Sequence, residues 1–302
     1  MFHPRAILHI FGMLMLLNGL FMATILPVSW FNGDGDFNPI LQSSISVSIL
    51  GFLVWFFTRN VKKELSKRDG YVIVGLGWVI MGLTGALPYY LSSTITSVPS
   101  AIFETFSGYT TTGASTLTDI ESLPSGIMLW RSMTQWIGGM GIIVLTVAIL
   151  PIFGVGGMEL FTAESPGPSS SKIHPKITDT FVETIFLKIA GMTWLDALNH
   201  SFTTLSTGGF STKNASIAAF DSPAIEYIIT GFMLIGGVNF SMIYFILKGT
   251  FNKVLNNEEF RTYLGIVALF TLVITISLYF TSDTTWSTSF RHTIFQVVTI
   301  VT

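Results

Sequence analysis

The sequence lacks cysteine and has few charged residues. Of its 302 residues none is Cys, 11% are charged and 50% are hydrophobic. The absence of Cys excludes a disulfide framework and a thiolate metal site. Since a soluble domain has about a quarter of its residues charged, this composition excludes an ordinary soluble domain. It indicates a polytopic membrane protein in the all-α class.

The residue groups of several other function classes are also missing. The formal net charge is −2, and no basic patch stands out beyond the loop clusters, which argues against a nucleic-acid partner. No Ser/His/Asp grouping and no phosphate-binding glycine loop is present, so an intramembrane hydrolase lacks its residues. The histidines have no metal-ligand spacing: His3, His9, His174, His200 and His292. We therefore expect neither an enzyme nor an organic cofactor.

Long runs without charge predict the membrane-spanning segments. A helix needs about 20 apolar residues to cross a bilayer core, and a charge at mid-bilayer costs roughly 2.5–3.5 kcal/mol. The runs that meet this requirement are 6–33, 37–58, 71–103, 132–158, 227–247 and 262–282. The third run should hold a span followed by a short re-entrant helix, since Pro88 and Pro99 interrupt it.

The positive residues predict the orientation. The loop 59–69 carries Arg59, Lys62, Lys63, Lys67 and Arg68 and should be cytoplasmic. Because two spans precede it, the N-terminus is predicted to be cytoplasmic as well. The loop 153–180 and the segment with Lys248, Lys253 and Arg261 fall on the same side. The protein should therefore be a multi-pass protein of the cytoplasmic (inner) membrane.

A repeated unit of a short helix followed by a Thr/Gly segment organises the chain. The first copy covers 100–116, the second 196–212, and a third begins at 291–302. Aligning the copies pairs Thr111 with Thr207, Thr112 with Gly208, and Gly113 with Gly209. In the third copy, 294–296 matches 102–104, and the last residue, Thr302, falls on Thr110. We expect an extended backbone at the threonines, with Gly113 free to take a positive φ.

Such segments can replace the water around a permeating cation with backbone carbonyls. Non-helical backbone at membrane depth is tolerated only where it is buried in protein or lines an aqueous cavity. The candidate metal-binding residues are those that would supply filter carbonyls: Thr111, Thr112, Gly113, Thr207, Gly208 and Gly209. The alternative is that these are ordinary re-entrant turns.

Polar residues near these segments have more than one interpretation. Glu104 either supplies a mild cation-attracting field or forms hydrogen bonds behind the filter, and its counterparts in the other copies are His200 and Gln296. We expect Arg131 to extend its charge toward the outer interface. Asn239 either lines the pore or bonds a neighbouring helix. The glycines at 138, 139, 141, 236 and 237 serve helix packing or a gate.

One stretch does not fit the predicted topology. The chain must cross outward between 178 and 196, but Glu183 and Lys188 interrupt that stretch, and it is too short to span alone. Either the helix is buried where the membrane core is thin, or residues near 177–185 are absent from this sequence. We favour absence, and we expect the chain to be truncated in its third repeat.

Several motifs resemble those of the Trk/Ktr/HKT superfamily of K⁺ transporters. They are the Thr/Gly segments above and the stretches at 135–142, 155–158 and 164–168. The resemblance implies helix–pore loop–helix repeats around a central pore, related to K⁺ channel pore domains, with an extra N-terminal two-helix unit. It also implies K⁺ as the transported ion, a homodimer, a TrkA-like cytoplasmic nucleotide-binding regulatory ring, and a glycine at 113 that favours K⁺ over Na⁺. The pattern departs from the family in the short stretch before 196 and in the lack of a full third and fourth repeat.

Together these observations predict four segments and one function. The segments are an N-terminal two-helix unit at 1–69, a first repeat at 70–160, an inner loop and second repeat at 161–260, and the start of a third repeat at 261–302. The function is that of a K⁺-selective, channel-like uptake subunit gated by the cytoplasmic regulator. Two alternatives are the channel-like subunit of a K⁺-pumping P-type ATPase and a membrane scaffold without a pore.

Overall fold

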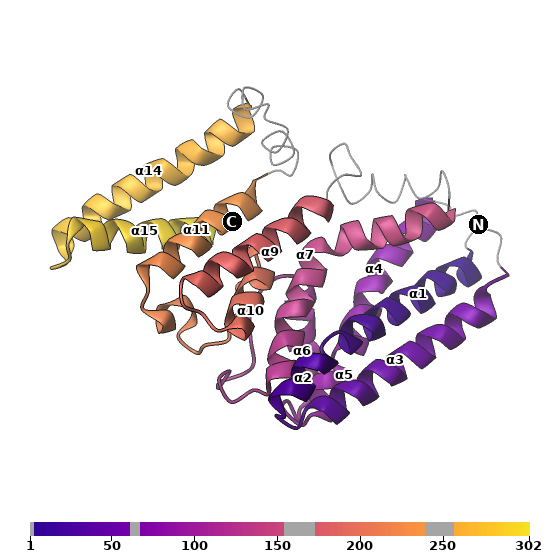
Figure 1. Ribbon diagram of the computed structural model, residues 1–302. Helices are drawn as coiled ribbons and strands as arrows, with labels where there is room; N and C mark the ends of the chain where they lie inside the picture. Colours follow the sequence, from indigo (N-terminus) through magenta and orange to yellow (C-terminus); the bar gives the residue numbers. More distant parts are fainter. Residues whose placement is uncertain (1–2, 61–66, 154–172, 239–256) are drawn as a thin grey trace. The chain divides into compact units, whose positions relative to one another are not determined.

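The computed structural model describes residues 3–60, 67–153, 173–238 and 257–302. These residues form helices and connecting turns, and no strand occurs among them. The chain divides into two compact units (Figure 1). Unit 1 comprises Met1–Ser170 with Gly208–Asn214, and unit 2 comprises Ser171–Thr207 with Ala215–Thr302. The predicted all-α class is therefore confirmed.

Unit 1 contains the N-terminal helices and the first predicted repeat. Its helices are α1 (Pro4–Ala23), α2 (Leu26–Asn32), α3 (Phe37–Thr58), α4 (Lys67–Gly85), α5 (Leu87–Leu91), α6 (Val98–Tyr109) and α7 (Ser125–Phe153). Helices α1 and α3 lie side by side along most of their length (Figure 1). Helix α6 contacts both α4 and α7.

Glycines bring α1 and α3 into backbone contact. A Cβ added at Gly51 would lie 2.7 Å from the backbone nitrogen of Leu16 and 2.8 Å from the carbonyl oxygen of Gly12. A Cβ at Gly12 would lie 2.6 Å from the backbone nitrogen of Trp55. Small residues permit this approach between membrane helices, where dispersion contacts replace the hydrophobic effect as the main attraction.

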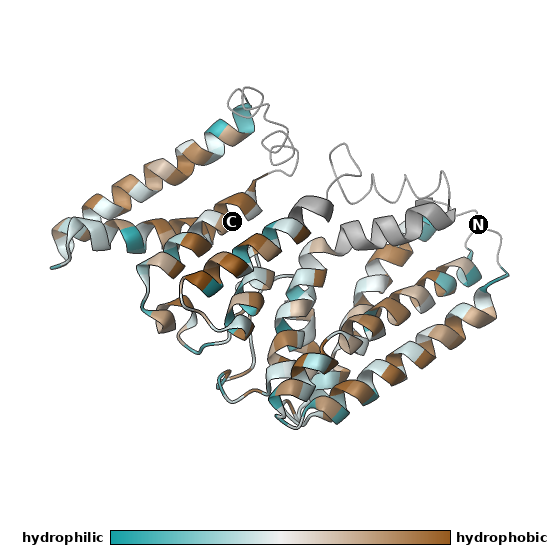
Figure 2. Ribbon diagram, viewed as in Figure 1, coloured by the Kyte–Doolittle hydropathy of each residue, from teal (hydrophilic) through white to brown (hydrophobic). Residues whose placement is uncertain are grey.

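Four helical segments among the described residues are long and apolar enough to cross a membrane. They are Pro4–Asn32, Phe37–Thr58, Arg68–Leu91 and Glu258–Thr281. Brown apolar residues lie along α3 and α14 (Figure 2), and Phe57 and Phe280 are about four-fifths exposed. These exposed apolar side chains are appropriate to a helix that faces lipid.

Two predicted runs are each divided into more than one helix near a proline. The run 6–33 contains α1 and α2, with Thr24 and Ile25 between them and Pro27 in the first turn of α2. The run 71–103 contains most of α4, all of α5 and the beginning of α6, with Pro88 and Pro99 in the first turns of the latter two. Proline is tolerated at these positions because its missing N–H has no partner in a first turn.

Unit 2 contains two more short helices in the predicted repeat positions. Its elements are α9 (Ile173–Ile189), α10 (Trp194–Leu205), the 3₁₀ turn η1 (Ser216–Phe220), α11 (Pro223–Gly237), α14 (Glu258–Thr281) and α15 (Trp286–Val301). Helices α6, α10 and α15 each begin after a Ser or Thr N-cap: Ser97, Thr193 and Thr285. They end before Thr110, Ser206 and Thr302, which are the positions paired by the sequence alignment.

Some predicted features lie outside the described residues. These are the inner-loop motifs at 155–158 and 164–168, and Asn239.

Candidate functional site

The first Thr/Gly segment folds back over the end of α6. The N–H groups of Thr111 and Thr112 donate to the carbonyl oxygens of Gly108 and Ser107, both at 2.9 Å. Thr111 has a φ of 54° and Gly113 a φ of 76°. The positive φ of Gly113 was predicted, whereas Thr111 adopts a left-handed conformation in place of the expected extended one. A positive φ is an outlier for a β-branched residue and is a form of strain that clusters at functional sites.

The second Thr/Gly segment has the same backbone conformation. Thr207 has a φ of 54° and Gly209 a φ of 76°. These are the two residues that the sequence alignment pairs with Thr111 and Gly113. The same uncommon pair of left-handed residues therefore follows two different short helices.

Most carbonyls of these segments have no hydrogen-bond partner in the part of the chain that the structure describes. Among the described residues, the carbonyl oxygens of Thr111, Thr112 and Gly113 accept no hydrogen bond, and neither do those of Thr207 and Gly209. In the first segment, the N–H groups of Thr111 and Thr112 donate hydrogen bonds to the end of α6, whereas the carbonyl groups of the same residues accept none from the described residues. Unpaired carbonyls at membrane depth must meet water or a cation, because lipid offers no donor.

Gly208 is the exception among the six candidate residues. Its carbonyl oxygen accepts a hydrogen bond from Nε2 of Gln135 at 2.7 Å, and Oε1 of Gln135 accepts one from the N–H of Phe210 at 3.1 Å. A Cβ added at Gly208 would overlap the carboxamide of Gln135, and a Cβ at Gly113 would overlap the carbonyl oxygen of Gly208. Within unit 1, the segments 111–113 and 208–210 and the side chain of Gln135 lie so close together that positions 113 and 208 have no room for a side chain.

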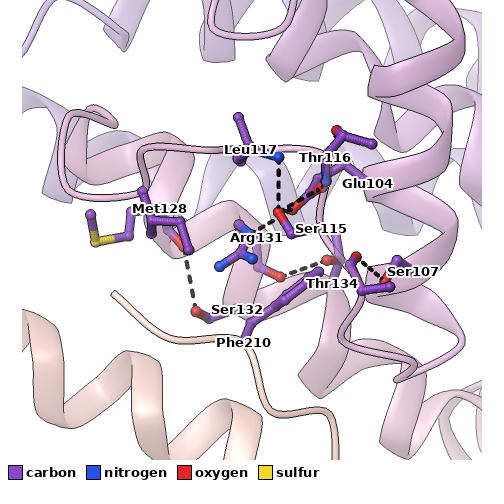
Figure 3. A network of polar contacts seen from close by, with 12 residues as sticks. Glu104, Ser107, Ser115, Thr116, Leu117, Met128, Arg131, Ser132, Thr134 and Phe210 are labelled. Carbon is purple, nitrogen blue, oxygen red and sulfur yellow. Dashed lines mark hydrogen bonds and ion pairs between the residues drawn. The ribbon is translucent and has the colours of Figure 1, made fainter. Parts of the chain in front are cut away.

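A buried ion pair supports the first segment from behind. Glu104 in α6 is completely buried, and Oε1 of its carboxylate lies 2.7 Å from Nε of Arg131 in α7, which is 2% exposed. The same carboxylate accepts hydrogen bonds from the hydroxyl of Ser115 at 2.9 Å and the N–H of Thr116 at 2.9 Å. Figure 3 shows these groups around Glu104. The carboxylate therefore forms hydrogen bonds behind the segment, which is one of the two predicted alternatives.

Arg131 extends the same network to the second segment. Its NH1 group donates to the carbonyl oxygen of Ser211 at 3.0 Å, and its Cζ lies 3.6 Å from the centre of the Phe210 ring (Figure 3). The prediction that Arg131 reaches toward the outer interface is wrong. The carboxylate of Glu104 and the ring of Phe210 satisfy the guanidinium inside the protein, so it does not need water.

The loops that follow the two segments are also joined. The carboxamide of Asn214 accepts from the N–H of Ile120 at 2.8 Å and donates to Asp119 at 3.1 Å. Lys213 and Glu121 form an ion pair of 3.4 Å between Nζ and Oε2. The hydrogen bond from Asn214 lowers the pKa of the Asp119 carboxyl below its ordinary value.

Comparison with known families identifies the chain. The sequence profile of the TrkH family, described as "Cation transport protein", matches residues 38–195 and 188–302. The chain belongs to the TrkH family of cation transport proteins. The predicted family resemblance is therefore confirmed.

Named relatives and a solved structure agree with the family. The chain is 42% identical to the Trk system potassium uptake protein TrkH of Salmonella typhimurium over 321 residues, and 42% identical to that of Escherichia coli over 322. Each alignment covers 99% of this chain and 65% of the relative. The crystal structure of the potassium transporter TrkH from Vibrio parahaemolyticus matches with a TM-score of 0.87 and 37% identity, over 99% of this chain and 64% of that one.

These comparisons fix the class of the protein. The chain spans about 65% of the length of its curated TrkH relatives. It is a polytopic, nearly all-helical membrane protein of a transport family, and its relatives carry the names of transporters and not of enzymes.

The sequence reading missed the role of Gln135. Gln135 and Arg131 are four residues apart on α7 and therefore lie on one face of that helix. Both are buried polar residues in a largely apolar helix, together with Ser132 and Thr134. The side chains of Gln135 and Arg131 share a polar partner, the backbone of the segment 208–211.

Proposed function

We propose that this TrkH-family chain belongs to a K⁺-selective, channel-like uptake protein of the cytoplasmic membrane. The observation that carries the proposal recurs in both segments: carbonyls that accept no hydrogen bond from the described residues lie at the paired left-handed residues Thr111 and Gly113, and Thr207 and Gly209. Carbonyl oxygens can replace the hydration shell of a monovalent cation without adding full charge. The names of the curated relatives, which are potassium uptake proteins, support K⁺ as that cation.

Five of the six candidate carbonyls could bind an ion without first losing a hydrogen bond to the described residues. The Gly208 carbonyl already accepts a hydrogen bond from Gln135. A carbonyl oxygen has two lone pairs, so this group can still meet an ion. We expect it to be a weaker ligand than the carbonyl of Thr112, its counterpart in the first segment.

The remaining parts of the proposal concern assembly and control. The family resemblance is the support for a homodimer, for a TrkA-like nucleotide-binding ring on the cytoplasmic side, and for further repeats that complete the pore. Helix α9 has only 17 residues, fewer than a span requires. The alignment with the Salmonella relative runs over 321 residues although this chain has 302. We infer that residues present in that relative have no counterpart within this chain, and we place their absence before α10.

Ion flux tests the proposal directly. The full-length protein is reconstituted in liposomes, and uptake of ⁸⁶Rb⁺, a K⁺ substitute, is compared with uptake of ²²Na⁺. We expect ⁸⁶Rb⁺ to enter protein-containing vesicles faster than empty ones and faster than ²²Na⁺. Equal uptake into both kinds of vesicle would reject the proposal in favour of a scaffold without a pore. Co-purification with a P-type ATPase chain would favour the pump-subunit alternative.

A further inference from the structure

Asn18 is a buried polar residue in the middle of the apolar helix α1. Its side chain is completely buried. A polar amide within a membrane span costs free energy unless it is paired, and such residues commonly hold helices together or serve function. Helix α1 belongs to the N-terminal two-helix unit and contributes none of the candidate carbonyls, so the position of Asn18 requires an explanation.

The carboxamide of Asn18 joins three helices. Its Nδ2 donates to the hydroxyl of Thr84 in α4 at 2.9 Å, and its Oδ1 accepts from the hydroxyl of Tyr109 in α6 at 2.6 Å. The Thr84 hydroxyl donates in turn to the carbonyl of Ile80 at 2.8 Å. The hydroxyls of Thr84 and Tyr109 therefore both act as donors. Only one orientation of the Asn18 amide satisfies both neighbours, with Nδ2 toward Thr84 and Oδ1 toward Tyr109.

Tyr109 is the last residue of α6 and directly precedes the first Thr/Gly segment. Its side chain is 1% exposed, and its ring lies near Trp78, with centroids 6.5 Å apart. Its carbonyl oxygen lies against Gly138 of α7, where a Cβ would overlap it. The placement of the Tyr109 ring and backbone therefore sets the point at which the chain leaves the helix toward Thr111.

The N-terminal unit also holds α7. The carboxylate of Asp34 accepts from the N–H of Ser125 at 2.9 Å, and that of Asp36 accepts from the N–H of Ile127 at 3.0 Å. These are free N–H groups in the first turn of α7, where an anion is favourable. Because α7 carries Arg131 and Gln135, which contact the segment 208–211, the N-terminal unit also supports that segment through α7.

We propose that the N-terminal two-helix unit supports the filter and that Asn18 is a positioning residue for the first filter segment, acting through Tyr109. The inference rests on the proposed function. Asn18 is too far removed in the chain of contacts to act as an ion ligand: it holds the ring of Tyr109, and Tyr109 holds the start of the segment. A rigid start keeps the carbonyls of Thr111 and Thr112 at a spacing that suits one ion size.

Three variants of the full-length protein test this role. Asn18→Leu removes both hydrogen bonds while keeping the branched shape of the side chain, and Tyr109→Phe removes only the hydroxyl. Ser44→Ala is the matched control, because Ser44 donates a buried hydrogen bond of 2.8 Å to the carbonyl of Gly19 between α3 and α1, away from the filter. For each variant, ⁸⁶Rb⁺ and ²²Na⁺ uptake into liposomes and the melting temperature in detergent are measured.

The ratio of ⁸⁶Rb⁺ to ²²Na⁺ uptake distinguishes positioning from general stability. We expect Asn18→Leu and Tyr109→Phe to lower this ratio by about fivefold, the equivalent of one net hydrogen bond, and Ser44→Ala to leave it unchanged while lowering the melting temperature. The double variant should be no worse than Asn18→Leu alone. If Tyr109→Phe keeps the wild-type ratio, the proposal is wrong although the proposed function stands. Absence of uptake by the wild-type protein would reject both.

Discussion

The guanidinium of Arg131 lies between the carboxylate of Glu104 and the aromatic ring of Phe210. Its Nε is 2.7 Å from Oε1 of Glu104, and its Cζ is 3.6 Å from the centre of the Phe210 ring. One buried cation therefore contacts α6 on one side and the segment 208–211 on the other. The side chain of Arg131 therefore joins two parts of unit 1 that are far apart in sequence.

Removing this cation should be strongly destabilising. In Arg131→Leu the carboxylate of Glu104 stays buried without its charge partner, and breaking a buried pair in this way typically costs about 3–5 kcal/mol. The exposed Arg59, whose Cζ lies 4.3 Å from the Phe56 ring, offers a control. Thermal unfolding in detergent should show a large fall in melting temperature for Arg131→Leu and a small one for Arg59→Leu.

A second substitution should recover part of that loss. In Arg131→Leu combined with Glu104→Gln, the buried carboxylate is replaced by a neutral amide, so the uncompensated charge disappears. The double variant should therefore melt above Arg131→Leu. Equal melting temperatures for Arg131→Leu and Arg59→Leu would contradict the importance of the ion pair.

Gly113→Ser should reduce the preference for K⁺ over Na⁺. A side chain at 113 must tolerate a φ of 76° and would overlap the carbonyl oxygen of Gly208, so the two Thr/Gly segments must move apart. Gly33→Ser is the control, because Gly33 has a φ of 69° and no atom within 4 Å of an added Cβ. We expect ⁸⁶Rb⁺ over ²²Na⁺ uptake to fall about tenfold in the first variant, since over-packing costs about 1–3 kcal/mol. An unchanged ratio would remove Gly113 from the filter.

The loss of stability caused by Gly208→Ala should be relieved by Gln135→Ala. An alanine Cβ at 208 would overlap the carboxamide of Gln135, which costs about 1–3 kcal/mol when neighbours cannot yield. Since Gln135→Ala opens that space, the double variant should melt no lower than Gln135→Ala alone, a non-additive result. Gly231→Ala, where nothing lies within 4 Å of the added Cβ, serves as control. Simple addition of the two single effects would argue against the contact.

Gly51→Ala should separate α1 from α3. Its Cβ would lie 2.8 Å from the Gly12 carbonyl oxygen and 2.7 Å from the Leu16 nitrogen, and these backbone atoms cannot turn aside as side chains do. We expect a loss of about 1–3 kcal/mol. Gly75→Ala on α4, with no atom within 4 Å of its Cβ, should have no such cost. Thermal unfolding of both variants decides the matter, and equal melting temperatures would count against close packing at this point.

Much of the fold follows from local patterns in the sequence. The predicted run 37–58 coincides with α3, and the predicted run 132–158 overlaps α7, which begins earlier, at Ser125. The interruption of the run 71–103 at Pro88 was predicted, and α5 begins there. The break between α1 and α2 was not predicted, because hydropathy continues across it, and Pro27 was the available signal.

The candidate site was only partly predictable. The alignment of the Thr/Gly copies paired Thr111 with Thr207 and Gly113 with Gly209, and these pairs have matching φ values. The left-handed conformation of the threonines was not predicted, since β-branched residues rarely adopt it. The burial of Arg131 was also missed, because its partners Glu104 and Phe210 lie in distant parts of the sequence.

The sequence by itself determined that this is a helical membrane protein with recurring Thr/Gly segments, because hydropathy, turn residues and repeats are local properties of the chain. Only the tertiary structure decided how those segments are supported. Hydrogen bonds and ion pairs between distant residues, such as Asn18 with Tyr109 and Gln135 with Gly208, depend on which helices lie side by side, and no local pattern encodes that choice.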